Sequence, residues 1–591
     1  MSAQELITDH LDLWTGAVTH KSGTGRSASG KNGKIELTGI KKLRELILEL
    51  AVRGKLVEQD PSDEPASVLL ERVAEEKARL VKEGKVKKSQ AIPTAVGSAD
   101  IHDAPKGWAL TTLAAIGYWA IGNGFPKQEQ GESGGEVLFC KVSDMNLSEN
   151  SREILKTKNT VSNEAAKRMR LKLHQPGTVI FPKIGGAIST NKRRIIVRPT
   201  AIDNNCLGIT PSCGILSDYL LLFLTSVDMT EYQAGTSVPA LSQSAIGKIG
   251  LCLPPLGEQR RIAKKVDELM AICDRLERQV GDQLEAHEVL VDTLLAALTR
   301  SVDAAEVAEN WARVAEHFDT LFTTEANIDK LKKTILQLAV IGRLVEQDPN
   351  DEPASLLLDK IAEEKARLVK EEKIKKPKRL PPIENNERSY QVHENWAWVR
   401  FQNIANEIST GPFGSMIHKH DYINNGVPLI NPSHMINGSI QEDVSVSISP
   451  QKAEELSSYK LNESDIVMAR RGEVGRCAIV SDREAGWLCG TGSFVLRFHE
   501  ALSRRFILMM FATDGVRRYL AGNSVGTTMT NLNHGILNRM PVALPPINEQ
   551  HRIVQKVDEL MALCDQLKKR LSESGKTRSQ LAETVVEQAV S

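Results

Sequence analysis

The sequence predicts an α+β protein in which two mixed α/β domains are separated by long antiparallel helices that form a coiled-coil spacer, with an internal pseudo-twofold repeat. Three observations predict this class. They are a duplicated helical frame, apolar stripes at helical spacing within that frame, and two strand-rich stretches between the copies. The length of 591 residues is enough for about three to five structural units.

The repeat consists of two matched pairs of segments. The residues from Leu50 read LAVRGKLVEQDP, and those from Leu338 read LAVIGRLVEQDP. The segment LPPLGEQRRI from Leu253 matches LPPINEQHRI from Leu544. The two pairs are offset by 288 and 291 residues, so the chain is a tandem duplication that carries two divergent inserts.

The segments that follow these LPP motifs are predicted helices, because apolar residues recur in steps of four and three. We expect a helix from about Glu258 to Ser301. We also predict that the two apolar stripes pack against each other as an antiparallel pair. The first stripe contains Ile262, Val266, Leu269, Cys273, Leu276 and Val280, and the second contains Ile553, Val557, Leu560, Cys564, Leu567 and Leu571.

Proline-containing linkers and changes in composition divide the chain into five regions. These are an N-terminal helical region (1–105), a first mixed domain (106–252), a central helical region (253–390), a second mixed domain (391–543) and a C-terminal helix (544–591). The block around residue 60 predicts a helical hairpin. Short β-branched or aromatic runs predict strands at residues 178–181, 194–197, 465–468, 477–480 and 493–498.

Cysteine usage and the apolar runs indicate where the protein works. Eight cysteines occur without any Cys-x-x-Cys pair, which predicts reduced thiols rather than disulfides or a zinc ribbon. The amino terminus has no signal-peptide pattern, and no aliphatic run is long enough to span a membrane. We therefore expect a cytoplasmic protein with no membrane partner.

Local charge differs from the overall balance. Lys plus Arg equals Asp plus Glu at 75 each, which by itself argues against a simple nucleic-acid binder. Between Arg152 and Arg198, however, twelve Lys or Arg residues face only Glu153 and Glu164. Such a patch attracts phosphates and favours nucleic-acid binding over a merely solvated surface.

Two catalytic motifs fail on inspection. Residues 25–31 resemble a phosphate loop, but Asn32 replaces the hydroxyl residue that would ligate magnesium, and no strand precedes them. The segment NPSH from Asn431 resembles the motif with which adenine methylases hold a flipped base, but it lacks the second proline and the aromatic residue. We predict that the chain has no catalytic and no cofactor-binding residues.

Metal binding is also disfavoured. His418 and His420 could form one side of a metal site, but no third and fourth ligand follow at a suitable spacing. We therefore interpret both as surface histidines and predict no metal-binding residues.

Several motifs together carry a family resemblance. Besides the two LPP segments, they are the insert openings PKGW from Pro105 and ENW from Glu394, the segments KVSDMN from Lys141 and NPSHMIN from Asn431, and the closing runs GTSVPALS from Gly235 and GTTMTNLN from Gly526. With these motifs on a duplicated frame, the sequence resembles specificity subunits of type I restriction-modification systems over essentially its whole length. The long extension before Ile40 departs from this pattern and suggests a longer subfamily.

The resemblance implies a non-catalytic, DNA-binding subunit. Its inserts would be two target recognition domains, each reading one half of an asymmetric bipartite site in double-stranded DNA. The partners it implies are two methylation subunits that use S-adenosylmethionine to modify adenine, and ATP-dependent restriction subunits that need magnesium. The cofactors would belong to those partners and not to this chain.

The candidate DNA-binding residues are polar or basic and lie in corresponding parts of the two inserts. In the first insert they are Lys141, Ser143, Asp144, Asn146, Lys183, Lys192, Arg193, Arg194, Ser237 and Ser242. In the second insert they are Asn431, Ser433, His434, Arg470, Arg471, Thr527, Thr528 and Asn531.

Two other classes of protein remain as alternatives. A transcription regulator would also lack catalytic motifs, but two different inserts fit two different half-sites better than they fit a palindromic operator. A coiled-coil scaffold would explain the apolar stripes, but it gives no reason for the strand-rich inserts or for the basic patch. Salt-dependent DNA binding separates a scaffold from a DNA-binding protein.

Overall fold

The computed structural model describes residues 9–17, 19–20, 35–83, 104–131, 134–235, 238–301, 304–523 and 531–590. Residues 25–31, which resemble a phosphate loop, lie outside the described residues, as do the site candidates Ser237, Thr527 and Thr528. The chain divides into two units. The first contains residues 1–283 and 575–591, and the second contains residues 284–574.

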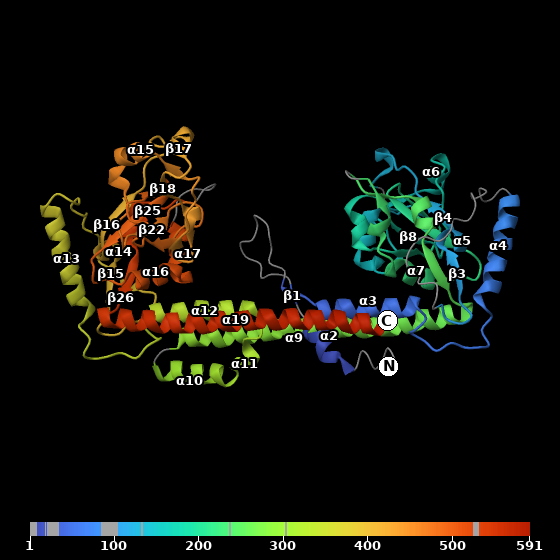
Figure 1. Ribbon diagram of the computed structural model, residues 1–591, viewed down its shortest axis with the longest axis horizontal. Helices are drawn as coiled ribbons and strands as arrows, with labels where there is room; N and C mark the ends of the chain where they lie inside the picture. The colour runs from blue at the N-terminus through green and yellow to red at the C-terminus, as the bar shows by residue number, and fades with distance from the viewer. Residues whose placement is uncertain are drawn as a thin grey trace. The chain divides into compact units, whose positions relative to one another are not determined.

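The helical frame of the first unit contains α2 and α3, α4, the start of α9 and the end of α19 (Figure 1). Their bounds are Leu11–Gly16 for α2, Thr38–Val52 for α3, Ala66–Lys82 for α4, Leu256–Arg300 for α9 and Ile547–Val590 for α19. The helices on either side of residue 60 are α3 and α4, but the predicted helical hairpin is wrong, because α4 stands across the end of the frame and does not pack along α3 (Figure 1). Gly54 follows α3 with a φ of +70°, and the bond from Lys55 N to Leu50 O, 2.9 Å long, closes this helix end.

The second unit repeats this frame. Its helices are α10 (Ala304–Glu316), α11 (Phe318–Leu321), α12 (Glu325–Val340) and α13 (Ala354–Lys370), with the end of α9 and the start of α19. Gly342 follows α12 with a φ of +75°, and Arg343 N donates to Leu338 O at 2.9 Å. The matching ends of α3 and α12 therefore use the same left-handed glycine and the same main-chain bond.

The two long helices run in opposite directions through the two units, because α9 starts in the first unit and α19 starts in the second. The expected helix from about Glu258 to Ser301 is confirmed as α9. The prediction that the two apolar stripes pack against each other is wrong. Leu269 is buried in the core of the first unit, and Leu560 packs against the core of the second. Apolar periodicity predicts which side of a helix is buried, but it does not identify the partner.

The helices α3 and α12 are the partners of these stripes. Arg44 of α3 pairs with Asp274 of α9 at 2.6 Å, and Lys332 of α12 pairs with Asp565 of α19 at the same distance. Each of these helices also contacts the end of the other long helix. In the first unit, Ala582 of α19 is buried in the core that contains α3. In the second unit, Lys330 of α12 pairs with Asp292 of α9 at 2.7 Å.

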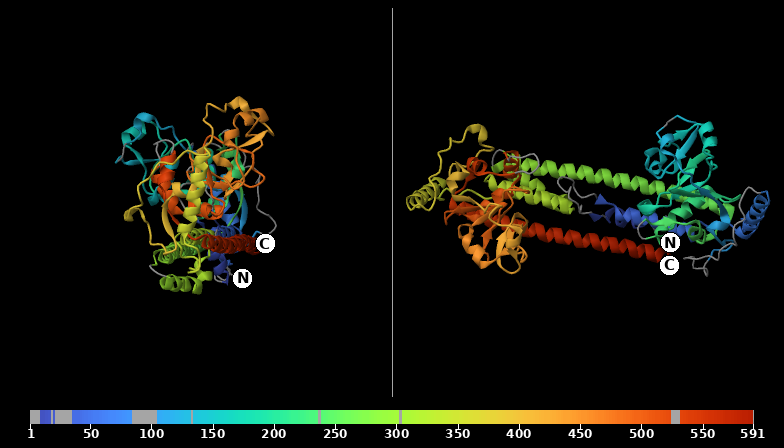
Figure 2. Two further views of the ribbon diagram at one scale, coloured as in Figure 1. Left: turned by 90° about the vertical axis from the view of Figure 1, so that its left-hand side faces the viewer. Right: turned by 90° about the horizontal axis from the view of Figure 1, so that it is seen from above.

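The first insert, coloured cyan to green in Figure 2, contains a five-stranded sheet in the order β4-β11-β8-β9-β6 and a three-stranded sheet in the order β10-β5-β7, and residues of both sheets share one hydrophobic cluster. The strands are β4 (Gly117–Ile121), β5 (Val137–Cys140), β6 (Glu153–Ile154), β7 (Asn159–Val161), β8 (Val179–Pro182), β9 (Arg194–Ile196), β10 (Thr200–Ile202) and β11 (Cys206–Pro211). The helices are α5 (Leu113–Ile116), α6 (Asn163–Arg168), α7 (Ser217–Ser226) and α8 (Gln243–Gly247).

The second insert contains one sheet in the order β16-β25-β22-β23 and another in the order β17-β21-β18-β24. The strands are β16 (Ala405–Thr410), β17 (Tyr422–Ile423), β18 (Val427–Ile430), β19 (Met435–Ile436), β20 (Ser439–Ile440), β21 (Ser447–Ile448), β22 (Ile466–Ala469), β23 (Cys477–Ile479), β24 (Leu488–Cys489) and β25 (Ser493–Phe498). The helices are α14 (Phe401–Ile404), α15 (Pro450–Glu455), α16 (Arg504–Ala512), α17 (Asp514–Asn523) and α18 (His534–Arg539). All five strands predicted from the sequence are confirmed, as β8, β9, β22, β23 and β25.

Each insert closes on itself where it joins the frame. In the first, β3 (Ala109–Thr112) pairs with β14 (Gly250–Leu253), and Ala109 lies opposite Leu253. In the second, β15 (Ala397–Arg400) pairs with β26 (Pro541–Leu544), and Ala397 lies opposite Leu544. Each insert therefore enters and leaves the frame through one antiparallel strand pair.

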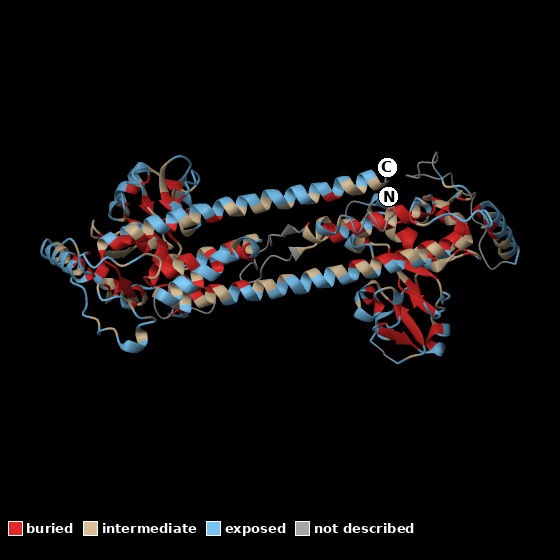
Figure 3. Cartoon of the chain, turned by 90° about the horizontal axis from the view of Figure 1, so that it is seen from below, coloured by how far each residue is buried: buried red, intermediate tan, exposed pale blue. Residues whose placement is uncertain are grey.

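Burial is concentrated in the strands and in the packed parts of the helices (Figure 3). Residues 274–290 of α9 and 565–581 of α19 contain no buried residue. These two stretches correspond in the repeat, so the long helices have matching exposed sections. Within the described residues, no helix combines the length and the apolar character that crossing a membrane would require.

Candidate nucleic-acid interface

The second insert brings the ends of several strands to one edge of its central sheet. Both neighbours of β25 run antiparallel to it, with Thr410 of β16 opposite Phe494 and Ala469 of β22 opposite Ser493. The loops after β16 and β22 and the loop before β25 therefore emerge together. We call these loops, residues 411–416, 470–476 and 490–492, the strand-end edge of the second insert.

The first insert has a corresponding edge. There β4 ends at Ile121 opposite Leu207, and β8 ends at Pro182 opposite Cys206. The loops 122–126, 183–192 and 203–205 form the strand-end edge of the first insert. The two edges have the same origin in the topology although their sequences differ.

A further segment joins each edge through one main-chain bond. Asp203 N donates to Cys140 O at 3.0 Å, which places the KVSDMN segment beside the first edge. Gly490 N donates to Ile430 O at 2.8 Å, which places the NPSH segment beside the second edge. The two segments, which the sequence identifies as related, thus occupy equivalent positions.

The closing run of each insert also pairs with its edge. Leu241 N donates to Lys183 O at 2.8 Å, and Leu532 N donates to Arg470 O at 2.9 Å. The next residue in each case caps a helix: Ser242 Oγ accepts from the main chain of α8, and Asn533 does the same for α18. The closing runs are therefore fixed against the strand ends by main-chain bonds and helix caps.

Most of the candidate residues at these edges are exposed or half-exposed. In the first insert they are Lys141, Ser143, Asn146, Lys183, Lys192 and Ser242, and in the second they are Asn431, Ser433, Arg470, Arg471 and Asn531. The structure thus brings together candidates that are up to about a hundred residues apart in the sequence.

Two polar candidates support the loops from inside. Asp144 is fully buried, and its carboxylate accepts from Lys141 N at 2.8 Å and Lys158 N at 3.1 Å. His434 occupies the corresponding place in the second insert, is also buried, and accepts from Asn431 N at 3.3 Å. Burial lowers the pKa of His434. Both side chains are buried and stabilise the main chain of their segments through hydrogen bonds, while neighbouring residues of the same segments are exposed.

Arg193 and Arg194 are likewise structural. The guanidinium of Arg193 is buried, lies 5.5 Å from the Phe181 ring, and donates to Leu224 O at 3.1 Å. Loss of hydration lowers its pKa to about 10. Arg194 donates to the main-chain oxygens of Asn150 and Met145 and so braces the KVSDMN segment. The basic run in the sequence therefore contains one buried arginine, Arg193, and one half-buried arginine, Arg194, whose guanidinium is bonded to main-chain oxygens.

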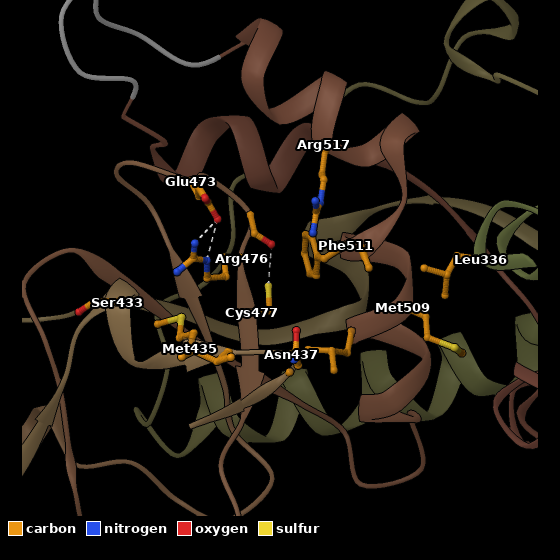
Figure 4. A pocket seen from close by; sticks show the side chains of 15 residues that line it. Leu336, Ser433, Met435, Asn437, Glu473, Arg476, Cys477, Met509, Phe511 and Arg517 are labelled. Carbon is orange, nitrogen blue, oxygen red and sulfur yellow. Dashed lines mark hydrogen bonds and ion pairs between the residues drawn. The ribbon is translucent and has the colours of Figure 1, made fainter. Parts of the chain in front are cut away.

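The second insert has a cavity where the first has Arg193. By strand register, Cys477 corresponds to Arg193, because Val467 pairs with Ala478 as Ile180 pairs with Arg194. Cys477 is one of the residues that line a cavity of about 580 Å³ in this insert (Figure 4). Its lining includes Met435, Cys477, Met509, Phe511, Arg476 and Arg517. The equivalent position is therefore a buried arginine beside β8 and β9 in the first insert and a cysteine that lines a cavity beside β22 and β23 in the second.

Two arginines lie side by side on the second edge. The Arg470 guanidinium lies 5.4 Å from the Phe494 ring and donates to Asn531 Oδ1 at 3.3 Å. Partial burial and the neighbouring Arg471 both lower the pKa of Arg470. Two adjacent cations repel each other, so a phosphate between them would be favoured.

Four contacts that the sequence analysis did not predict occur in matching pairs in the two copies of the repeat. Trp108 donates to Glu258 at 2.9 Å, and Trp396 donates to Glu549 at 2.8 Å. In the same way Arg261 pairs with Asp63 at 2.6 Å, and Arg552 pairs with Asp351 at 2.7 Å. The two Trp–Glu bonds join each insert to its frame, whereas the two Arg–Asp pairs lie within the frame and join each long helix to the segment before α4 or α13. Their identity in both copies was the signal that could have identified them.

The two histidines considered as metal ligands stack on each other. The rings of His418 and His420 have centroids 5.4 Å apart. Across the described parts of the chain, no group of three or more His, Cys, Asp or Glu residues is arranged to hold a metal ion.

Comparison with known proteins identifies the family. A model of the type I restriction modification DNA specificity domain matches residues 105–286 and 394–574. The chain belongs to this family. The two matches contain both inserts and the first part of each long helix, so the specificity domain is present in two copies.

Two curated relatives align with the whole specificity chain. It is 37% identical to the type I restriction enzyme EcoAI specificity subunit of Escherichia coli over 614 residues, and 36% identical to the EcoEI specificity subunit of the same species over 622 residues. Both alignments cover 100% of each chain. A crystal structure of the HsdS subunit from Thermoanaerobacter tengcongensis is 18% identical, with a TM-score of 0.41, over 83% of this chain and 98% of that one.

Proposed function

We propose that this specificity chain recognises an asymmetric bipartite DNA target, with each insert reading one half through its strand-end edge. One observation carries the proposal. The two edges share their main-chain arrangement but present different side chains, such as Lys183 and Arg470 at one position and Lys141 and Asn431 at another. A shared scaffold with different polar groups is what reading two unlike half-sites requires.

The exposed candidates divide by chemistry. Lys183, Lys192 and Arg471 would contact phosphates, which supplies affinity without sequence preference. Side-chain amides and hydroxyls would contact base edges, which supplies specificity. These are Ser143, Asn146, Asn431, Ser433 and Asn531.

The proposal also assigns partners. The helical frame would position two methylation subunits, which use S-adenosylmethionine, and restriction subunits, which use ATP and magnesium. The matching exposed stretches 274–290 and 565–581 support two equivalent docking places. In this proposal the chain itself binds none of these cofactors, and the complex acts on DNA in the cytoplasm.

Domain exchange tests the division of labour. Residues 106–252 are replaced by the corresponding insert of a relative, and methylated sites are sequenced in a host that carries the complete system. We expect one half of the target to change and the other half to persist. Altered bases in both halves would contradict independent reading by the two inserts.

Salt dependence tests the edge itself. The double variant Lys183→Met and Lys192→Met should weaken binding to all DNA sequences and reduce the slope of log affinity against log salt by about 1 to 2. Lys264→Met is the matched control, because Lys264 is an exposed lysine on α9. Equal slopes for the double variant and the control would show that this edge does not contact phosphates.

A further inference from the structure

Phe413 lies on the surface, where a phenylalanine side chain is not expected. Its side chain is 69% exposed, the largest value for any large apolar residue in the described part of the chain. Phenylalanine usually buries its ring, so an exposed ring on a loop points to a ligand or a partner.

The loop that carries Phe413 is rigidly attached to the strand-end edge. Gly411 N donates to Ser493 O at 3.1 Å, and a Cβ at Gly411 would lie 1.9 Å from Gly490 O. Only glycine allows this close approach. Met416 N donates to Phe413 O at 2.9 Å and closes a tight turn. The exposed ring is therefore presented from a fixed base beside the NPSH segment.

The first insert uses its loop aromatic in the opposite way. In the corresponding loop after β4, Phe125 stacks on Phe139 with ring centroids 3.8 Å apart and an interplanar angle of 13°. The Lys141 ammonium lies 5.3 Å from the Phe125 ring. The aromatic of the first edge thus packs inward, whereas that of the second edge projects outward.

The surroundings of Phe413 are basic. His418, Lys419 and His420 are exposed on the same loop, and Arg471 is exposed on the neighbouring loop of the edge. Two acidic residues also lie in these loops: Asp421 accepts from His418 N at 2.6 Å, and Glu473 pairs with Arg476. An exposed ring with Lys419 on its own loop and Arg471 on the neighbouring loop is complementary to a nucleic acid, whose bases offer flat faces and whose phosphates offer negative charge.

We infer that Phe413 inserts its ring against a base in the second half-site and partly unstacks one base step. This inference rests on the proposed function and deepens it, because it adds recognition of how easily a base step unstacks to recognition of base edges. The first insert would read its half-site through polar contacts alone. The second would also favour sequences with an easily opened base step at the position that Phe413 reaches.

Binding measurements on the full chain, assembled with its partner subunits, test the inference. The probe is a labelled duplex that carries the target identified by methylation sequencing. We expect Phe413→Ala to bind about 5- to 150-fold more weakly, the range for losing one base–aromatic stack, and Phe413→Trp to retain binding. The matched control is Val444→Ala, which removes another exposed apolar side chain of the same insert (51% exposed). Because both residues are exposed, thermal unfolding should be unchanged in all three variants.

A mismatched probe isolates the unstacking. A set of duplexes is prepared, each with a single mismatch at a different base step of the second half-site. In each duplex the mismatched step is already partly unstacked before the protein binds. At the step that Phe413 enters, the mismatch should strengthen binding of the unmodified chain and have no such effect on Phe413→Ala.

The outcomes are distinguishable. If Phe413→Ala binds DNA as Val444→Ala does, the inference is wrong while the proposed function stands. If Phe413→Ala loses partner subunits but keeps its DNA affinity, the ring contacts protein and the inference is also wrong. If the unmodified complex binds no DNA, both the inference and the proposed function fail.

Discussion

The indole nitrogen of Trp108 donates a hydrogen bond to the buried carboxylate of Glu258 at 2.9 Å. This bond joins the start of the first insert to the start of α9 and has a counterpart between Trp396 and Glu549. Burial raises the pKa of Glu258 although the indole bond acts in the opposite direction. The contact therefore connects the insert to the frame, but it does so through a buried carboxylate whose charged form is disfavoured.

Replacing Glu258 by glutamine should make the first unit less sensitive to pH. The folded state holds the Glu258 proton more tightly than the unfolded state, so this group's contribution to stability falls as pH rises above its ordinary pKa of 4.5. Glutamine keeps an oxygen for the indole and has no charge. Urea unfolding between pH 4.5 and 8 should show that Glu258→Gln gains stability over the unmodified chain as pH rises. Glu258→Ala, the control, should lose about 1 to 3 kcal/mol at all these pH values.

Lys77 predicts a second pH effect at higher pH. Its ammonium donates to Ala114 O at 2.7 Å and Gly117 O at 2.9 Å, and burial lowers its pKa to about 8. The folded state therefore releases this proton before the unfolded state does, and stability should rise between pH 8 and about 10.5. The same unfolding measurement on Lys77→Met should show a smaller rise, and the rise that remains comes from Lys365, whose pKa burial also lowers to about 8. An identical pH profile for both proteins would contradict the assigned pKa.

Arg193 should behave as a packing residue and not as a DNA contact. Arg193→Met keeps the volume and removes a poorly hydrated charge, so the free energy of unfolding should change by less than about 1.5 kcal/mol. Arg193→Ala opens a cavity and should cost about 3 kcal/mol. Neither variant should change the salt slope of DNA binding. A reduced slope in Arg193→Met would place the guanidinium at the DNA after all.

The two apolar stripes should be independent of each other. Leu269→Asp places a charge without a partner in the core of the first unit and should unfold that unit, whereas Leu560→Asp should act on the second unit. Hydrogen exchange followed by peptide mass spectrometry reports the two units separately. Loss of protection in both units from either single substitution would show that the stripes form one shared core.

Local pattern predicted much of the fold. The steps of four and three in α9 and α19, and the β-branched runs of β8 and β25, are determined by neighbours in the sequence, and these elements were predicted within a few residues. The partner of each helix was not predictable in this way. It depends on contacts such as Arg44 with Asp274, which are 230 residues apart.

The site was predicted in part for a related reason. Residue type and position in the repeat identified the loops, and Lys183 and Arg470 do lie at equivalent strand ends. Burial within those loops could not be read from the sequence. Lys192 is half-exposed and Arg193 next to it is buried, because neighbouring residues beside a strand point to opposite sides. Phe413, which we propose as a further contact, could not be selected from the sequence because an isolated phenylalanine resembles any core residue.

The main-chain bonds from Leu241 to Lys183 and from Leu532 to Arg470 have an evolutionary consequence. Since they use no side-chain atoms, mutations at these strand ends can exchange one side chain for another while the loops keep their positions. If the strand ends read DNA as we propose, single substitutions there would change the recognised sequence while the loops keep their fold. Because the two edges lie in separate inserts, the same proposal would let each half of the target diverge without the other.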